Sequence, residues 1–230
     1  MKIKILGTKG EIDKSLPRHV KQSGLLIDKT LLIDLGEKSY LKYHPKWILI
    51  THLHPDHAYF IRRGQQENPA TKAVLFAPEK ARGTQILGKK RKLGPYSITP
   101  IPTHHSKHVK SQAYLIKKGR KSILYTGDLV WIDKKYHHLF DRVDLIITDG
   151  SFLREGGMIR KDAKTKKLFG HNGIPNLIRL FRPFTKKILF VHFGSWFFSY
   201  PKASKAKLLA LGKKYNVEIL IGYDGMKINL

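Results

Sequence analysis

The chain has 230 residues, and its 44 Lys and Arg against 17 Asp and Glu give a formal net charge of +27 at pH 7. It has no cysteine, which excludes disulfides, thiolate metal sites, iron–sulfur clusters and cysteine nucleophiles. No apolar run approaches the ~20 residues of a membrane span, and the N-terminal residues alternate like a strand, with no signal-peptide core. These features predict one folded domain over residues 1–230, in the cytoplasm and without a membrane partner.

The basic surplus has two interpretations. It indicates either attraction to a polyanion, most simply nucleic acid, or a background of charged surface residues such as thermophiles carry. The clusters Lys89–Lys92 and Arg160–Lys167 fall in predicted loops and are the better candidates for phosphate contacts. The basic residues around Gly119 are more typical of a solubilising hairpin tip.

Short apolar runs bounded by Gly, Pro or charged residues predict strands along the whole chain. In chain order, the runs are Ile3–Leu6, Leu25–Ile27, Leu31–Ile33, Trp47–Ile50, Ala73–Phe76, Ile98–Ile101, Ala113–Ile116, Ser122–Tyr125, Leu145–Ile147, Ile188–Val191, Val217–Ile221 and Met226–Ile228. Helices are expected over His57–Arg63, Pro78–Leu87, Lys134–Phe140, Ile174–Phe181 and Pro201–Lys213. The polar, glycine-rich stretch Gly150–Gly170 predicts a long loop. The pattern as a whole indicates an α/β fold with β-sheet at its centre.

A cluster of metal-binding side chains follows the strand Trp47–Ile50. It has the pattern H-x-H-x-D-H, formed by His52, His54, Asp56 and His57. Alternation along an extended segment places the first three side chains on one face. Imidazoles with carboxylates suit zinc, and also manganese or iron. A histidine-rich solvated loop is the plainer interpretation, but further donors follow downstream.

Three more donor positions lie beyond later strands. His104 and His105 follow one strand, Asp128 ends the segment Tyr125–Asp128, and His192 follows Ile188–Val191. Open sheets place their sites at the carboxyl ends of strands. A site with two metals, each taking about three protein ligands and a water, needs donors of this kind.

In this order the motifs resemble those of the metallo-β-lactamase superfamily, over nearly the whole chain. The resemblance implies a four-layer αβ/βα sandwich of two mixed sheets flanked by helices. It also implies two divalent metal ions, most simply zinc, bridged by hydroxide and an Asp. The implied ligands are His52, His54 and His105 for the first metal, Asp56, His57 and His192 for the second, and Asp128 for both. His105 is preferred to His104 because relatives commonly show a His-Ser pair here, and Ser106 follows.

Within the superfamily, the chain is most similar to ribonuclease Z and related phosphodiesterases. Gly170–Gly173 resembles the G-H-S-T segment of that branch, His192–Ser195 its H-x-S, and Tyr223–Asn229 its terminal Y-D-x-x-x-x-N. The H-E-A-T element of ribonuclease Z reads Thr148–Ser151 here, without the catalytic His, and the long tRNA-binding arm has no counterpart. We therefore expect a phosphodiesterase or nuclease acting on RNA, DNA or another phosphodiester, without ribonuclease Z activity.

The implied mechanism is attack by a metal-bridged hydroxide. Asp56 would orient the nucleophile and accept its proton, and His171 is a candidate proton donor to the leaving group. His171 is equally compatible with a structural role at the entry of a helix. The alternatives are a lactone, thioester or β-lactam hydrolase on the same scaffold, and a non-catalytic nucleic-acid-binding module. Dimerisation is common in such folds, so a homodimer is a further expectation.

Three groups of residues remain outside this assignment. The aromatic side chains Trp196, Phe197, Phe198 and Tyr200 follow His192 and form either a hydrophobic plug or a stacking surface for a base. Arg154, Arg160 and Lys161 are expected near the metal site, as phosphate contacts. The remaining histidines are expected at the surface, namely His19, His44, His108, His137 and His138.

Overall fold

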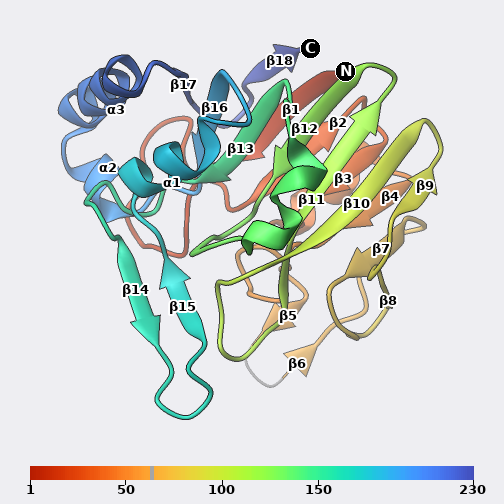
Figure 1. The fold of residues 1–230 in the computed structure, drawn as a ribbon. Helices are drawn as coiled ribbons and strands as arrows, with labels where there is room; N and C mark the ends of the chain where they lie inside the picture. The colour runs from red at the N-terminus through yellow and green to blue at the C-terminus, as the bar shows by residue number, and fades with distance from the viewer. Residues whose placement is uncertain (63–64) are drawn as a thin grey trace.

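Two seven-stranded mixed sheets dominate the computed structural model, which describes residues 1–62 and 65–230 (Figure 1). The first sheet has the order β18-β1-β2-β3-β4-β7-β8, and the second has the order β17-β16-β13-β12-β11-β10-β9. The strands of the first are β1 (Lys2–Gly7), β2 (Gly24–Ile27), β3 (Leu31–Ile33), β4 (Trp47–Leu49), β7 (Val74–Ala77), β8 (Thr84–Ile86) and β18 (Lys227–Asn229). Those of the second are β9 (Arg91–Leu93), β10 (Tyr96–Thr103), β11 (Ser111–Lys118), β12 (Lys121–Tyr125), β13 (Leu145–Asp149), β16 (Lys187–Val191) and β17 (Glu218–Ile221).

Each sheet is antiparallel in one half and parallel in the other. β1, β2 and β3 pair antiparallel, whereas β3, β4, β7 and β8 pair parallel. In the second sheet β9 to β12 pair antiparallel, and β12, β13, β16 and β17 pair parallel. The parallel strands bring their carboxyl ends to one edge of each sheet, where the polar side chains of interest lie.

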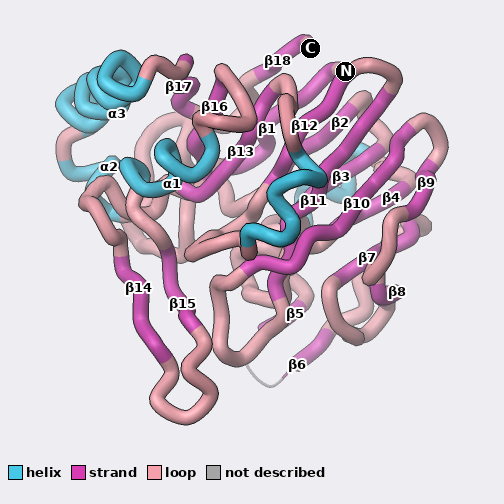
Figure 2. The backbone as a smooth tube through the Cα atoms, in the orientation of Figure 1, coloured by secondary structure: helices cyan, strands magenta, loops and turns pink. Residues whose placement is uncertain are grey.

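Alternation along the strands separates the core into layers. On β12, Ile123 packs in the cluster between the two sheets, and its neighbour Leu124 packs in the cluster under the helices. The elements on the outer face of the second sheet are η2 (Lys134–Phe140), α1 (Ile174–Phe181), α2 (Ser195–Ser199) and α3 (Pro201–Tyr215), visible in cyan in Figure 2. A third cluster, around Tyr40 of η1 (Lys38–Tyr43), covers the first sheet. The αβ/βα sandwich expected from the sequence is confirmed.

Two of the expected helices are wrong. Residues 57–60 form turns and not a helix, because Leu35 N–H bonds to His57 O and Tyr59 N–H bonds to Leu35 O. The chain then enters the short strand β5 (Ile61–Arg62), which pairs with β6 (Gln65–Gln66); Arg63, at the end of the expected helix, lies outside the described residues. The helix expected over residues 78–87 is replaced by β8, whose pairing with β7 outweighs local helix preference.

The expected long loop over residues 150–170 is also wrong in part. It contains a hairpin of β14 (Met158–Lys161) and β15 (Leu168–His171), which projects away from the sandwich in Figure 1. Gly170 has φ +108°, and a Cβ at this position would lie 2.0 Å from Met158 O. The hairpin thus depends on this glycine. No helix in the described part of the chain is long and apolar enough to cross a membrane.

Candidate metal centre

The segment after β4 carries the H-x-H-x-D-H motif into the space between the sheet edges. The buried carboxylate of Asp34, at the end of β3, accepts hydrogen bonds from Thr51 N–H at 2.7 Å and from Thr51 Oγ1 at 3.0 Å. It also lies 2.7 Å from Nδ1 of His57. Asp34 therefore holds both ends of the motif in place.

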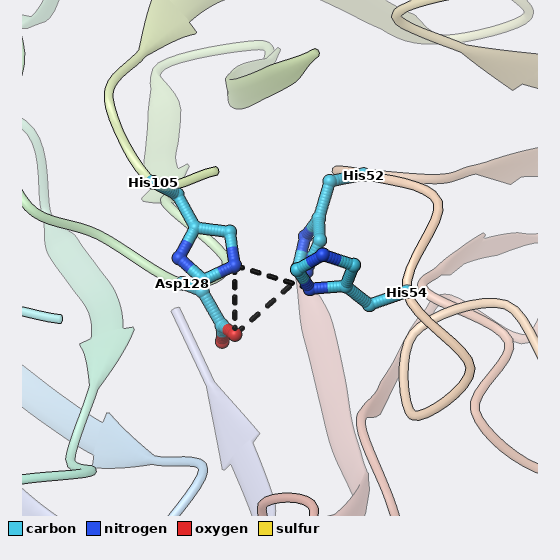
Figure 3. A group of neighbouring side chains, drawn as sticks. All are labelled: His52, His54, His105 and Asp128. Carbon is cyan, nitrogen blue, oxygen red and sulfur yellow. Dashed lines mark hydrogen bonds and ion pairs between the residues drawn. The ribbon is translucent and has the colours of Figure 1, made fainter. Parts of the chain in front are cut away.

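Four side chains form a first group, shown in Figure 3: His52, His54, His105 and Asp128. Nε2 of His105 lies 3.2 Å from Nδ1 of His54 and 3.5 Å from Oδ2 of Asp128. Nε2 of His52 lies 3.7 Å from the same carboxylate oxygen. One ligand atom from each residue falls within 4.8 Å of the others, so the group can hold a metal ion.

A second group shares Asp128 with the first: Asp56, His57, Asp128 and His192. Nε2 of His192 lies 2.9 Å from Oδ2 of Asp56 and 3.3 Å from Oδ1 of Asp128. Nε2 of His57 lies 3.1 Å from Oδ1 of Asp128. The two oxygens of Asp128 thus face different groups, the arrangement that a bridging carboxylate requires.

The partners of the Nδ1 atoms define which histidine nitrogen faces these groups. The carboxylate of Asp34 can only accept, so Nδ1 of His57 carries the proton. Thr51 Oγ1 gives its own proton to Asp34 and therefore accepts one from Nδ1 of His52, at 3.1 Å. Both histidines consequently direct Nε2 at the centre, the nitrogen that a metal ion would bind in place of a proton.

The same logic applies to the histidines of the other strands. Nδ1 of His105 donates to the carbonyl oxygen of Gly170 at 2.9 Å. Ser151 Oγ donates to Asp149 at 2.5 Å, so it accepts the Nδ1 proton of His192 at 2.8 Å. In both histidines Nδ1 is therefore held by an acceptor, and Nε2 is the nitrogen directed at the carboxylates, where a metal ion would bind.

Burial and mutual proximity perturb the titration of these groups. Burial lowers the pKa of His105 to about 4, and burial with the neighbouring imidazoles lowers the pKa of His52 well below its usual value. Burial lowers the pKa of His57 too, but the carboxylates of Asp128, Asp34 and Asp56 outweigh it and hold that pKa well above its ordinary value. The pKa of Asp128 is held well below its usual range, because the facing imidazoles outweigh its burial. Such opposed shifts are typical of functional sites.

Two buried atoms test whether the donors suit a metal. Nε2 of His52 and Oδ1 of Asp128 have no hydrogen-bond partner, although both residues are buried. Buried polar atoms are rarely left without a partner, and a divalent cation between these groups would satisfy both. The residues therefore fit divalent metal ions.

The structure brings together all seven sequence-predicted metal ligands and also His171. Nδ1 of His171 lies 2.7 Å from Oδ2 of Asp149, and its Nε2 lies 3.9 Å from Asp128. His104 turns away, with Nε2 2.9 Å from a carboxylate oxygen of Asp133, so His105 is the member of the pair at the centre.

Sequence reasoning missed the two buried carboxylates that hold the histidines, Asp34 and Asp149. Asp149 accepts hydrogen bonds from Leu129 N–H and Ser151 N–H as well as from Ser151 Oγ. Both residues stand at the ends of parallel strands, the same signal that identified Asp128 and His192. The contacts that give them their role join residues far apart in the chain.

A pocket of ≈ 490 Å³ opens at the metal groups. Its remaining walls include Ile12, Phe152, Met158 and Trp196. The aromatic segment after His192 is thus divided: Phe197 and Phe198 are buried core residues, Tyr200 is 75% exposed, and Trp196 lines the pocket.

Of the histidines expected at the surface, His19 is buried, so the prediction for this residue is wrong. It is 4% exposed, packs against Phe193, Phe197 and Phe198, and its Nδ1 lies 2.9 Å from Thr8 Oγ1. His44, His108 and His138 are exposed and His137 is half-buried.

The fold and the paired groups define a metallo-β-lactamase-fold hydrolase whose His and Asp cluster can bind metal ions. The chain belongs to the beta-lactamase superfamily, because residues 41–193 match the family described as Beta-lactamase superfamily domain. A search of the curated proteins found no match for the chain.

Solved structures share the fold over the whole length. The metallo-beta-lactamase fold protein YhfI from Bacillus subtilis is 17% identical, with a TM-score of 0.71, over 99% of this chain and 98% of that one. A diphosphatase from the PhnP family is 14% identical, with a TM-score of 0.65, over 100% and 97%. The short form of human tRNase Z is 15% identical, with a TM-score of 0.64, over 100% and 99%. At such identities the likeness shows the fold alone.

Proposed function

We propose that the protein is a dinuclear metal-dependent phosphodiesterase or nuclease that acts on RNA or DNA. The observation that supports this most is the sharing of Asp128 by two groups of His and Asp ligand atoms, with its two oxygens facing different groups. Two divalent ions, most simply zinc, would supply Lewis acidity at the scissile phosphate and acidify the attacking water. His52, His54 and His105 would hold one ion, and Asp56, His57 and His192 the other.

Asp56 and His171 would move the protons. Asp56 lies at the pocket surface, where its carboxylate can orient the attacking water and accept its proton. His171 also lines the pocket, with its Nδ1 proton held by Asp149. Burial lowers the pKa of His171, but the carboxylates of Asp149 and Asp128 outweigh it and raise that pKa, which favours a proton on Nε2 for the leaving oxygen.

A phosphodiester is favoured over an acyl substrate by the charge of the chain and by its likeness to the ribonuclease Z branch. The net charge of +27 attracts polyanions at long range. Arg160 and Lys161 are exposed on β14, beside the strand that carries His171. An acyl hydrolase is the second candidate, because apolar side chains form much of the pocket wall.

Hydrolysis of labelled single-stranded RNA and DNA by zinc- or manganese-loaded protein tests the proposal. We expect cleavage by the wild type and none by Asp56→Ala, while the exposed-site control Asp141→Ala cleaves normally. Turnover of lactones or thioesters without phosphodiester cleavage would favour the second candidate. Tight, salt-sensitive RNA binding without any turnover would instead indicate a binding module.

The contribution of the hairpin is measured separately. Arg160→Ala with Lys161→Ala should weaken binding of RNA and make it less sensitive to salt, because each lost phosphate contact lowers the slope by about 1. An unchanged slope would show that these side chains are merely solvated.

A further inference from the structure

The walls of the metal pocket differ sharply in charge from the rest of the molecule. The chain has 44 Lys and Arg among 230 residues. Yet no Lys or Arg lines this pocket in residues 1–62 and 65–230. Apart from the metal groups and His171, Glu11 is the one charged side chain among the described residues of its lining. Negative charge on a substrate would therefore be met by metal ions held in the metal groups and by His171, and the rest of the substrate meets a wall without cations.

The aromatic part of this wall is held in place before any ligand arrives. Trp196, on α2, donates its Nε1–H to Gly150 O at 2.9 Å. Its ring packs edge-on against Phe197 at 5.6 Å and Phe193 at 6.2 Å, both fully buried. Because core residues hold the indole, little side-chain entropy remains to be lost on binding.

Phe152 is a second aromatic residue of the wall, held by its backbone. Its carbonyl oxygen accepts a hydrogen bond from Ile174 N–H at 2.9 Å, which ties it to the first residue of α1. Its ring lies 5.9 Å from the ring of His171. A flat group bound near Phe152 would thus stand next to the leaving-group side of the site.

We propose that Trp196 and Phe152 form a recognition site for a nucleobase-sized aromatic group attached to the scissile phosphodiester. The inference rests on the proposed function and narrows its substrate class. Bases stack on aromatic side chains with little dependence on sequence, so this site would accept many sequences. The absence of Lys and Arg from the described lining disfavours diphosphate and other polyphosphate substrates, which require cations along their length.

The test compares two ligands of equal charge on zinc-loaded protein, each with a methylene group in place of the leaving oxygen so that no turnover interferes. One is adenylyl-(3′,5′)-adenosine, and the other is the same phosphodiester with both bases replaced by hydrogen. Ligand-observed NMR titration gives both dissociation constants. We expect the dinucleotide to bind about 10-fold more tightly, as the loss of a base–aromatic stack would predict.

Substitutions in the pocket wall test whether Trp196 and Phe152 cause the preference for the dinucleotide. Trp196→Leu keeps apolar volume but removes the stacking ring, and should bring the dinucleotide close to the affinity of the abasic ligand. Phe152→Leu should reduce the preference as well. Tyr200→Ala removes an exposed aromatic of the same segment that does not line the pocket, and should change nothing. Circular dichroism and melting curves verify that each variant folds.

The outcomes separate this inference from the proposed function. Equal affinity for both ligands, or a preference unchanged in Trp196→Leu and Phe152→Leu, would overturn the base site even if the loaded protein cleaves RNA. A preference lost in Trp196→Leu supports the base site even if no phosphodiester is cleaved. Binding of dihexyl phosphate as tight as that of the dinucleotide, retained in Trp196→Leu, would overturn it in favour of an alkyl-chain pocket.

Discussion

Asp34→Asn should weaken metal binding while leaving the shape of the protein almost unchanged. The carboxylate of Asp34 lies 2.7 Å from both Nδ1 of His57 and the amide of Thr51. An asparagine offers one accepting oxygen and a donating NH2 group, so it cannot accept from both. If the NH2 group faces His57, the ring proton moves to Nε2, which points at Asp128 at 3.1 Å. The lone pair needed for a metal is then lost.

The magnitude follows from the role of such supporting contacts. Removing the partner of a metal-binding histidine lowers metal affinity by about 10–100-fold, which corresponds to about 1.4–2.7 kcal/mol. The assay is competition for zinc against a chromophoric chelator, at pH 7.5 and fixed ionic strength. Zinc stoichiometry measured by mass spectrometry shows whether one or both sites empty.

Asp28→Asn is the matched control. Asp28 also follows a strand of the first sheet, and it accepts hydrogen bonds from Lys2 N–H, Tyr96 and Lys118. It does not belong to the metal groups, so its variant should lose stability without losing zinc. Zinc affinity of Asp34→Asn within two-fold of wild type, in a folded protein, would refute the reasoning about the ring proton.

Three further predictions concern stability and metal removal. Burial lowers the pKa of His19 to about 4. A histidine with a lowered pKa in the folded state stabilises the protein above the unfolded pKa of about 6.5, and this stability is lost as the pH falls. The free energy of unfolding of metal-free wild type should therefore fall by about 3 kcal/mol more than that of His19→Asn between pH 7 and 4. Equal losses in urea titrations would contradict this. Gly170→Ala should lower zinc affinity about 10-fold by displacing the carbonyl that orients His105. Gly156→Ala is the control, because Gly156 also has a positive φ of +76° but open space around its Cβ, and it should leave zinc affinity unchanged. Equal zinc affinities of the two variants would show that the Gly170 carbonyl does not orient His105 for metal binding. Chelation should lower the melting temperature and readdition of zinc should restore it, because ligands that bind the folded state stabilise it; a melting curve unaffected by chelator would argue against bound metal.

The sequence predicted the strands well because their signal is local. Apolar alternation between turn residues located the strands of both sheets except short edge and hairpin strands such as β8, β9, β14 and β15. Those strands are short and only partly apolar, so pairing with a neighbour decides their conformation. The expected helix over residues 57–63 failed because backbone bonds to Leu35 hold that segment in turns.

The candidate ligands were also identifiable from the sequence, for a similar reason. H-x-H-x-D-H lies in one short segment after β4, and each later donor stands at the end of an apolar run. Spacing alone left His104 and His105 open, and the resemblance favoured His105. Only the bonds from His105 to Gly170 and from His104 to Asp133 show which of the two faces the centre.

The sequence by itself therefore determined which residue types converge and on which edge of the sheets, because that information lies within single strands and their ends. The tertiary structure alone decided how those residues are held. Asp34 meets His57 from another strand, Asp149 meets His171 across 22 positions, and Trp196 reaches Gly150 across 46. Hydrogen bonds between such distant residues depend on the packing of the whole chain, and no local periodicity encodes them.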